Sequence, residues 1–144
     1  MQVHQILRSK PPLQVVTVLP GSSVADAARL LSERRIGAII VSDDGLVPLG
    51  ILSERDIVRD VGRRGAVCLK DTVDTLMTRN LISCAPHDSA DSVLEKMTAG
   101  RFRHMPVLQD GKMIGIISIG DVVAARMAEL AMEKDALAGM IMGN

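Results

Sequence analysis

An internal repeat constrains the fold of this chain more than any other feature of its sequence. The segment Pro20–Val41 aligns without a gap with the segment Pro86–Val107, at a constant offset of 66 residues. The match continues to Asp56 and Asp121 at an offset of 65, because one residue is lost in the intervening turn, a change that a hairpin loop tolerates easily. The sequence therefore predicts two copies of one supersecondary unit.

Each copy has the pattern of a β-α-β-β-α unit. A serine and an apolar period of three to four residues predict a helix in SSVADAARLLSERR and in DSADSVLEKMTAG. Two short apolar runs around a turn then predict paired strands, GAIIV with VPLGIL and RHMPVL with KMIGIIS. A second helix begins at SERDIVRDV and ends near Gly62, and its counterpart runs from Ile119 to Leu137.

The two copies are predicted to share one module. A unit of roughly 60 residues with helices on one face of its sheet leaves apolar surface uncovered, so the halves should pack together. The predicted fold class is α+β, with two tandem repeats related by a pseudo-two-fold axis. The predicted domains are repeat 1 at 3–62, an ordered connection at 63–75, repeat 2 at 76–130 and a helical tail at 131–144. The tail is rich in Ala and Met and is expected to pack on the domain or on a second subunit.

Composition excludes several classes of function. Seventeen basic and seventeen acidic side chains cancel, so no global field favours nucleic acid or an anionic membrane as a partner. The start of the chain has no leader-like apolar segment, and no apolar run reaches the length of a membrane span. Cys68 and Cys84 have no metal-like or redox-like spacing and fit reduced thiols, so we expect a cytoplasmic protein without a metal site.

The strings GILSERD at 50–56 and GIISIGD at 115–121 are the candidate binding motifs. Both read G-I-h-S-x-x-D, where h is apolar, at a point where a predicted strand leads into a helix. The Ser hydroxyl, the Asp carboxylate and the free amides of the first helical turn then lie close together. The small volume between them suits a ribose with an attached phosphate. The same S-x-x-D pattern is also a capping box that only starts a helix. Its occurrence at equivalent positions of a repeat favours the binding interpretation, although both roles are compatible in one residue.

These features resemble the CBS-domain family over residues 3 to 130. The helix after Pro20, the paired strands, both G-I-h-S-x-x-D strings and RHMPV at 103–107 all match the family pattern. The resemblance implies a free-standing Bateman-type module, disc-like, with two clefts that hold AMP, ADP, ATP, NAD or S-adenosylmethionine. It also implies a homodimer and a non-catalytic regulatory role, with output through an unidentified effector protein.

The resemblance also implies a set of site residues. Ser53 with Asp56, and Ser118 with Asp121, would hold ribose and phosphate. The base would be enclosed by the backbone near Thr17, Ile82 and Ser83 and by the side chains around Met105 and Pro106. Expected phosphate partners are Arg55, Arg101 and Arg103. The first repeat has Gly37-Ala38-Ile39-Ile40 where the second has Arg103-His104-Met105-Pro106, so the cleft that contains Arg103 and His104 is expected to bind better.

Three functions remain open from the sequence. The first is a sensor of an adenine nucleotide, AMP or ATP before NAD, which changes conformation on binding. The second is an interaction scaffold whose degenerate clefts bind no nucleotide, with Ser and Asp acting only as helix caps. The third is an enzyme acting on the bound nucleotide, for which His104 is the candidate base. No nucleophile elbow, P-loop or Rossmann fingerprint accompanies it.

Overall fold

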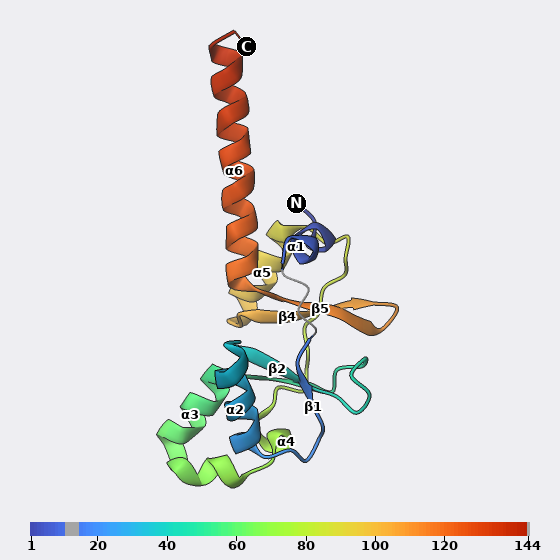
Figure 1. Cartoon of the computed structure of the whole chain (residues 1–144), viewed down its shortest axis with the longest axis vertical. Helices are drawn as coiled ribbons and strands as arrows, with labels where there is room; N and C mark the ends of the chain where they lie inside the picture. The colour runs from blue at the N-terminus through green and yellow to red at the C-terminus, as the bar shows by residue number, and fades with distance from the viewer. Residues whose placement is uncertain (11–14, 144) are drawn as a thin grey trace.

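The two copies of the repeat form the two halves of the molecule in the computed structural model, which describes residues 1–10 and 15–143 (Figure 1). Residues 11–14 of the predicted first repeat, and Asn144 of the predicted tail, lie outside the described residues. The first half contains β1 (Thr17–Val18), α2 (Val24–Arg34), β2 (Ala38–Val41), β3 (Gly50–Ser53) and α3 (Glu54–Arg64). The second half contains α5 (Ala90–Gly100), β4 (His104–Gln109), β5 (Lys112–Ser118) and α6 (Ile119–Ile141).

The sheets of the two halves are related by the repeat. In the first half β2 pairs in parallel with β1 and antiparallel with β3. In the second half β4 and β5 form an antiparallel pair, and a single parallel bridge between Cys84 and Val107 stands where the first half pairs Val18 with Val41. The predicted α+β fold with two equivalent units is therefore confirmed, with the first strand of the second unit reduced to one bridge.

Local sequence sets most of the helix and turn boundaries. The side chains of Ser23 and Ser89 cap α2 and α5 by accepting hydrogen bonds from backbone amides. The Asp110-Gly111 turn has positive φ at both residues, which is the geometry of a tight two-residue hairpin. The prediction that the helix after GILS ends near Gly62 is wrong, because α3 continues to Arg64 and Gly65, at φ +78°, ends it.

Each half is completed by a short helix that precedes the other repeat. Helix α1 (Val3–Ser9), which the sequence analysis did not predict, buries Val3 and Ile6 in the core of the second half. The segment between the halves contains a 3-10 helix, η1 (Ala66–Lys70), and α4 (Val73–Leu76), and Val73 is buried in the core of the first half. This exchange ties the two halves into one module.

Each half has its own aliphatic core, as the near absence of aromatic residues requires. The first core contains Val24, Ala27, Leu31, Ile39, Val41, Leu52, Ile57 and Val73. The second core contains Val3, Ile6, Cys84, Ala90, Val93, Met97, Met105, Val107, Ile117, Val122 and Ala125. Because the cores are separate, the space between the halves is left to partly polar surfaces, and this is where the clefts lie.

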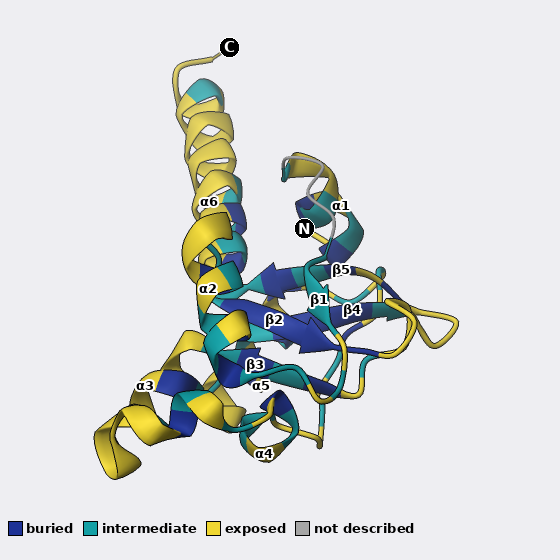
Figure 2. Cartoon of the chain, turned by 60° about the horizontal axis from the view of Figure 1, so that its bottom comes forward, coloured by how far each residue is buried: buried dark blue, intermediate teal, exposed yellow. Residues whose placement is uncertain are grey.

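Helix α6 begins beside the second half and then extends away from the module (Figure 1). Only Val122 and Ala125, near its start, are buried, and its distal part is exposed on all sides (Figure 2). Within residues 1–10 and 15–143, no helix has the combined length and hydropathy that crossing a membrane requires.

Candidate functional site

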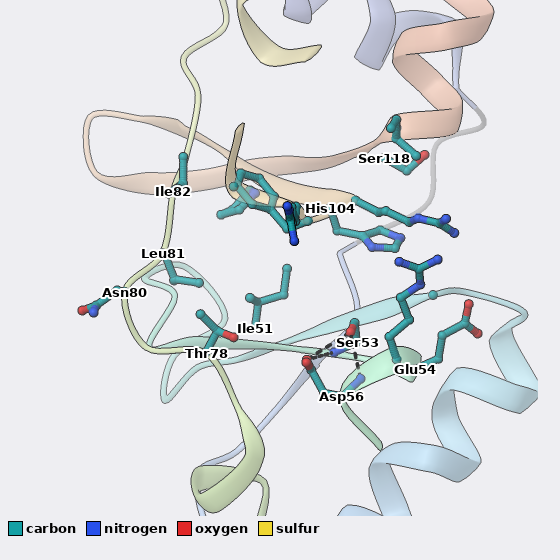
Figure 3. Close-up of a pocket in the computed structure, with 18 of the residues that line it drawn as sticks. Ile51, Ser53, Glu54, Asp56, Thr78, Asn80, Leu81, Ile82, His104 and Ser118 are labelled. Atoms are coloured by element: carbon teal, nitrogen blue, oxygen red, sulfur yellow. Dashed lines mark hydrogen bonds between the residues drawn. The ribbon is translucent and has the colours of Figure 1, made fainter. Parts of the chain in front are cut away.

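The larger of two clefts between the halves, here called the first cleft, has a volume of about 610 Å³. Figure 3 shows Ser53 and Asp56 on the wall formed by the first half and His104 and Ser118 on the facing wall. The segment from Thr78 to Ile82, which connects the halves, runs along one side. The first cleft is lined by Gly37, Ile51, Ser53, Glu54, Arg55, Asp56, Arg59, Thr78, Asn80, Leu81, Ile82, Gly100, Arg101, Phe102, Arg103, His104, Pro106, Ser118, Ile119 and Gly120.

Ser53 and Asp56 form a capping box at the start of α3. The Asp56 amide donates to Ser53 Oγ at 3.2 Å, and Asp56 Oδ2 accepts from the Ser53 amide at 2.9 Å and from Ser53 Oγ at 3.0 Å. The other carboxylate oxygen, Oδ1, lies 3.5 Å from Arg59, an exposed side chain. The cap therefore engages one oxygen of Asp56, and the other faces an exposed cation that a ligand hydroxyl can replace at little cost.

Arginine side chains dominate the charge of the first cleft. Four arginines line it, Arg55, Arg59, Arg101 and Arg103, against two carboxylates. Two amides of the first turn of α3 are already engaged, since the Glu54 amide donates to the Gly37 carbonyl and the Asp56 amide donates to Ser53. From the sequence, we expected those amides to bind a phosphate. Because they already have hydrogen-bond partners and the arginines are always charged, the arginines are the better candidates for binding a phosphate.

Apolar and neutral polar groups occupy the part of the first cleft beside the connecting segment. Ile51, Ile82 and Pro106 supply apolar surface there. Thr78 and Asn80 supply hydrogen-bonding side chains, and Thr78 is held by reciprocal backbone hydrogen bonds with Ile51 at 2.9 and 3.0 Å. A flat heterocycle with polar edges suits such a lining, because apolar surface covers its faces while amide and hydroxyl groups reach its edge.

The second cleft, of about 490 Å³, is the counterpart of the first across the pseudo-two-fold axis. It is lined by Leu7, Lys10, Val15, Val16, Arg35, Ile36, Gly37, Ala38, His104, Ile114, Ile116, Ser118 and Asp121. Ser118 and Asp121 repeat the capping box, with the Ser118 amide 2.8 Å from Asp121 Oδ2 and the Asp121 amide 3.1 Å from Ser118 Oγ.

The carboxylate of Asp121 differs from that of Asp56 in having a close cationic partner. Lys10 Nζ lies 2.8 Å from Asp121 Oδ2. Partial burial by itself raises the pKa of Asp121, but the hydrogen bonds from Lys10 and from the Ser118 amide outweigh it and hold the pKa below its ordinary value. Asp121 is therefore ionised and paired at neutral pH.

The structure brings most of the predicted site residues to the clefts. Ser53, Arg55, Asp56, Ile82, Arg101, Arg103, His104, Pro106 and Ser118 line the first cleft, and Asp121 lines the second. Arg103 therefore lies in the cleft of Ser53 and Asp56 and not in the cleft of Asp121, the aspartate of its own repeat.

Three predicted residues lie elsewhere. Met105 is fully buried in the core of the second half, because alternate residues of β4 point to opposite faces and its neighbours His104 and Pro106 take the cleft side. Expecting its side chain to enclose a base was wrong. Thr17 and Ser83 line neither cleft.

Four polar residues of the first cleft, Glu54, Arg59, Thr78 and Asn80, were not predicted from the sequence. Arg59 follows Arg55 by four residues on α3, so helical periodicity could have placed both side chains on one face. Thr78 and Asn80 had no comparable signal, because the backbone pairing of Thr78 with Ile51 joins residues far apart in the sequence.

His104 lies between the two clefts and lines both. Its ring fits against Gly37, where an added Cβ would come within 2.9 Å of the imidazole. Burial lowers the pKa of His104 below 6.5; Glu54 and Asp121 oppose this shift, while Lys10 and Arg103 add to it. The imidazole is therefore neutral at pH 7 and adds no charge to either cleft there.

We expect this buried imidazole to make the folded chain less stable in mild acid. The unfolded chain binds a proton at His104 more readily than the folded one, so stability present above pH 6.5 is lost as the pH falls through the lowered folded pKa. The loss is about 1.4 kcal/mol for each unit of pKa difference. Calorimetric melting at pH 7.5 and pH 5 should show a smaller acid decrease for His104→Gln than for the native chain. Equal acid slopes in His104→Gln and the native chain would contradict the assignment.

Other reactive groups lie away from the clefts. Cys68 and Cys84 are free and buried, and burial raises the pKa of the Cys84 thiol to about 11. Within the described part of the chain, no group of three or more His, Cys, Asp or Glu side chains is arranged to hold a metal ion. The two clefts are thus the candidate sites for a small-molecule ligand.

Comparison with known proteins gives consistent results. A family model for the CBS domain matches residues 3–63 and 73–128. The curated protein CBSCBSPB2 of Arabidopsis thaliana, a CBS domain-containing protein, is 32% identical over 128 residues, which are 87% of this chain and 24% of that protein. The chain thus spans about a quarter of the length of this relative.

Solved structures resemble the chain over nearly its whole length. A CBS-domain containing protein from Agrobacterium tumefaciens superposes with a TM-score of 0.83 at 45% identity, covering 88% of this chain and 99% of that one. A CBS domain protein from Pyrobaculum aerophilum, complexed with AMP, has a TM-score of 0.76 at 26% identity, with coverages of 92% and 99%. The CBS domain pair of protein MJ0100, in complex with 5′-methylthioadenosine and S-adenosyl-L-methionine, has the same TM-score and identity, with coverages of 90% and 98%.

Proposed function

The chain belongs to the CBS-domain family, and on that premise we propose that it is a regulatory module that binds an adenine nucleotide in the first cleft and transmits the bound state to another protein by a change of conformation. AMP and ATP are the preferred candidates, and NAD is a third. The two buried, reduced cysteines are consistent with a cytoplasmic module.

The observation that carries this proposal is the order of groups along the first cleft. A carboxylate on the start of α3, Asp56, can accept hydrogen bonds from two vicinal ribose hydroxyls. Arginines stand on the same helix and on the facing half, where they can bind one or more phosphates. Ile51, Ile82 and Pro106 form the apolar end, with Thr78 and Asn80 beside it for the edge of a base. Base, ribose and phosphate thus each have a matching set of side chains.

The solved relatives support an adenosine-containing ligand. One contains AMP and another contains 5′-methylthioadenosine and S-adenosyl-L-methionine, so adenosine is common to these ligands and the group on the ribose 5′ carbon varies. In this chain the four arginines of the first cleft favour an anionic phosphate over a cationic sulfonium. This charge balance is the reason for preferring a nucleotide to S-adenosylmethionine.

The test starts from the ultraviolet spectrum of the purified protein. With no Trp or Tyr and one Phe, the chain absorbs little near 260 nm, so bound adenine is visible directly. Mass spectrometry of material released on denaturation identifies a retained ligand. Calorimetric titration of ligand-free protein with AMP, ADP, ATP, NAD and S-adenosylmethionine then ranks the affinities. We expect a phosphate-bearing ligand to bind at micromolar concentration and S-adenosylmethionine to bind more weakly.

Two results would replace this proposal. If none of the five ligands binds below about 1 mM, the capping role of the two Ser and Asp pairs is their whole function, and the interaction-scaffold hypothesis stands. If a bound nucleotide is converted to product at a rate that His104→Ala abolishes, the module is an enzyme. A simple saturable binding isotherm with unchanged ligand supports the sensor.

We also propose that α6 joins two copies of the chain. Exposed residues follow one another on it at intervals of three and four, which is the spacing of a coiled-coil seam. The α6 seam consists of Val123, Met127, Leu130, Lys134, Leu137 and Ile141. It faces away from the buried Val122 and Ala125, so it is open to a partner along its length.

The single lysine of the α6 seam favours an antiparallel pair. In a parallel pair Lys134 would face Lys134 of the second copy, and the two charges would repel. An antiparallel pair centred near Met132 instead sets Lys134 against Leu130 of the second copy, Met127 against Leu137 and Val123 against Ile141. Met127 and Leu137, and Val123 and Ile141, then cover one another, and Leu130 is covered by the aliphatic part of Lys134.

Replacing Leu137 with Lys is expected to weaken this dimer at least roughly tenfold. The change removes one buried leucine per copy, each contributing about 1.5–3 kcal/mol, and adds a charge to the seam. Met132→Lys is the matched control, since Met132 is 61% exposed, close to the 59% of Leu137, but lies on the opposite side of the helix. Sedimentation equilibrium of the three proteins measures the dissociation constants. A monomeric native chain, or equal weakening by both variants, would contradict the seam.

A further inference from the structure

The two clefts differ in one charged contact. In the second cleft, Lys10 Nζ donates to Asp121 Oδ2 at 2.8 Å and to the Ile116 carbonyl at 2.9 Å. In the first cleft, the carbonyl equivalent to that of Ile116 belongs to Ile51 and accepts the Thr78 amide at 2.9 Å. Among the described residues, the carboxylate of Asp56 there has only the exposed Arg59 as a cationic partner, at 3.5 Å. The carboxylate of the second cleft thus has a close ammonium partner, whereas one oxygen of the carboxylate in the first cleft lies toward an exposed arginine.

Helix α1 holds Lys10 in this position. Val3 and Ile6 are buried in the core of the second half, and the amides of Val3 and His4 each donate to carbonyls of the segment before α5 at 2.9 Å. The terminal amine of Met1 also pairs with Glu129 on α6 at 2.7 Å. Lys10 follows directly after α1, and its amide donates to the Leu7 carbonyl. The backbone of Lys10 is therefore held in place, and its side chain extends into the second cleft.

The contact between Lys10 and Asp121 is partly shielded from solvent. The two carboxylates are equally exposed, Asp121 at 22% and Asp56 at 21%, but Lys10 is 28% exposed against 67% for Arg59. A charge-assisted hydrogen bond in such a setting is stronger than one on the open surface, and a neutral hydroxyl competes poorly with an ammonium for the same carboxylate oxygen. A ribose entering the second cleft would have to displace Lys10 first and leave its charge without a partner.

We propose that Lys10 closes the second cleft to nucleotides by occupying the place at which ribose hydroxyls would meet Asp121, so that each chain binds one nucleotide, in the first cleft. This inference rests on the proposed function. Lys10 is then a specificity-determining residue that distinguishes two sites built from the same repeat. The remainder of the second cleft is suited to a nucleotide, with Arg35 for a phosphate and Val16, Ile36 and Ile114 as apolar surface. Removal of the lysine is therefore sufficient to open it.

The number of binding sites per chain tests this inference. Calorimetric titration of the full chain with AMP and, in parallel, ATP should give one site for the native protein and two for Lys10→Met, which keeps most of the side-chain length and removes the charge. Lys96→Met is the control, because Lys96 lies on α5, is exposed and has only a 3.9 Å contact with Asp88. It should give one site. Circular dichroism checks that all variants are folded.

A second variant separates the two sites. Asp56→Ala disables the first cleft, and Asp56→Ala combined with Lys10→Met should regain one site in the second. Two sites in the native chain, or one site in Lys10→Met together with no binding by the double variant, would overturn the role of Lys10 and leave the proposed function intact. A native chain that binds neither AMP nor ATP would instead refute the proposed function itself.

Discussion

The Asp56→Ala variant is expected to bind adenine nucleotides about 100-fold more weakly than the native chain. Its carboxylate belongs to the capping box at the start of α3, and one of its oxygens lies toward the exposed Arg59, so two ribose hydroxyls would donate to it. Hydrogen bonds to a charged acceptor contribute about 1.5–3 kcal/mol each, so losing two costs about 3 kcal/mol or more. Titration with AMP and with adenosine should show the same loss, because both ligands carry the ribose.

Asp121→Ala is the matched control for this prediction. Both substitutions remove the carboxylate of a capping box, so each should lower the free energy of unfolding, Asp56→Ala by about 1 kcal/mol and Asp121→Ala by more, because it also leaves Lys10 without its partner. Only Asp56→Ala should change affinity, because Asp121 is paired with Lys10 and lies in the other cleft. Lower stability with unchanged affinity in both variants would mean that neither aspartate holds the nucleotide.

The Leu52→Ala variant is expected to lose about 3 kcal/mol of folding free energy, within a range of 2–5. Leu52 is fully buried, pairs across the sheet with Ile39 and belongs to the core of the first half. Alanine would leave a cavity that the flanking residues cannot close, since the strand that carries Leu52 is pinned on one side by β2 and leads directly into α3. For a chain of this size the loss corresponds to a melting temperature lower by roughly 6–12 °C.

Thermal melting followed by far-ultraviolet circular dichroism measures this loss, because a chain without Trp or Tyr has no useful intrinsic fluorescence. Val58→Ala on α3 is the control: it removes a slightly smaller apolar group from a residue that is 70% exposed, and its effect should stay within about 0.5 kcal/mol. Similar melting temperatures for the two variants would show that the first half does not depend on its own core.

Adding nucleotide should separate these two variants further. Leu52→Ala keeps Ser53 and Asp56, so saturating ligand should recover part of its melting temperature, since a ligand that binds only the folded state stabilises it. Asp56→Ala should gain little from the same concentration. This comparison distinguishes a damaged core from a damaged site with one instrument.

Much of the fold could be predicted because it depends on local pattern. Ser23 and Ser89 cap helices where the sequence predicted them, and the Asp110-Gly111 turn closes the expected hairpin. Helix α1 could not be predicted in the same way. It has seven residues and two buried side chains, and what stabilises it is the core of the second half, formed by residues some 80 to 120 positions later.

The composition of the clefts was predicted in part. The paired Ser and Asp residues were found because a repeat of a polar motif is visible in the sequence, and both pairs do line clefts. The side chain of Met105 was wrongly predicted to line a cleft, because the residues of RHMPV at 103–107 were not divided between the two faces of the strand. The two-residue period of a strand sends His104 and Pro106 to the cleft and Met105 to the core.

By itself, the sequence determined the repeated unit, its helices and strands, and the two Ser and Asp pairs at the helix starts, because these depend on residues within one or two turns of each other. Only the tertiary structure decided which groups share a cleft: that Arg103 and His104 face Asp56 across the halves, and that Lys10 faces Asp121. Such contacts follow from the packing of one half on the other and from the exchange of α1, and no local pattern encodes them. The pseudo-two-fold axis makes the two sites alike, and one lysine that follows α1 makes them different.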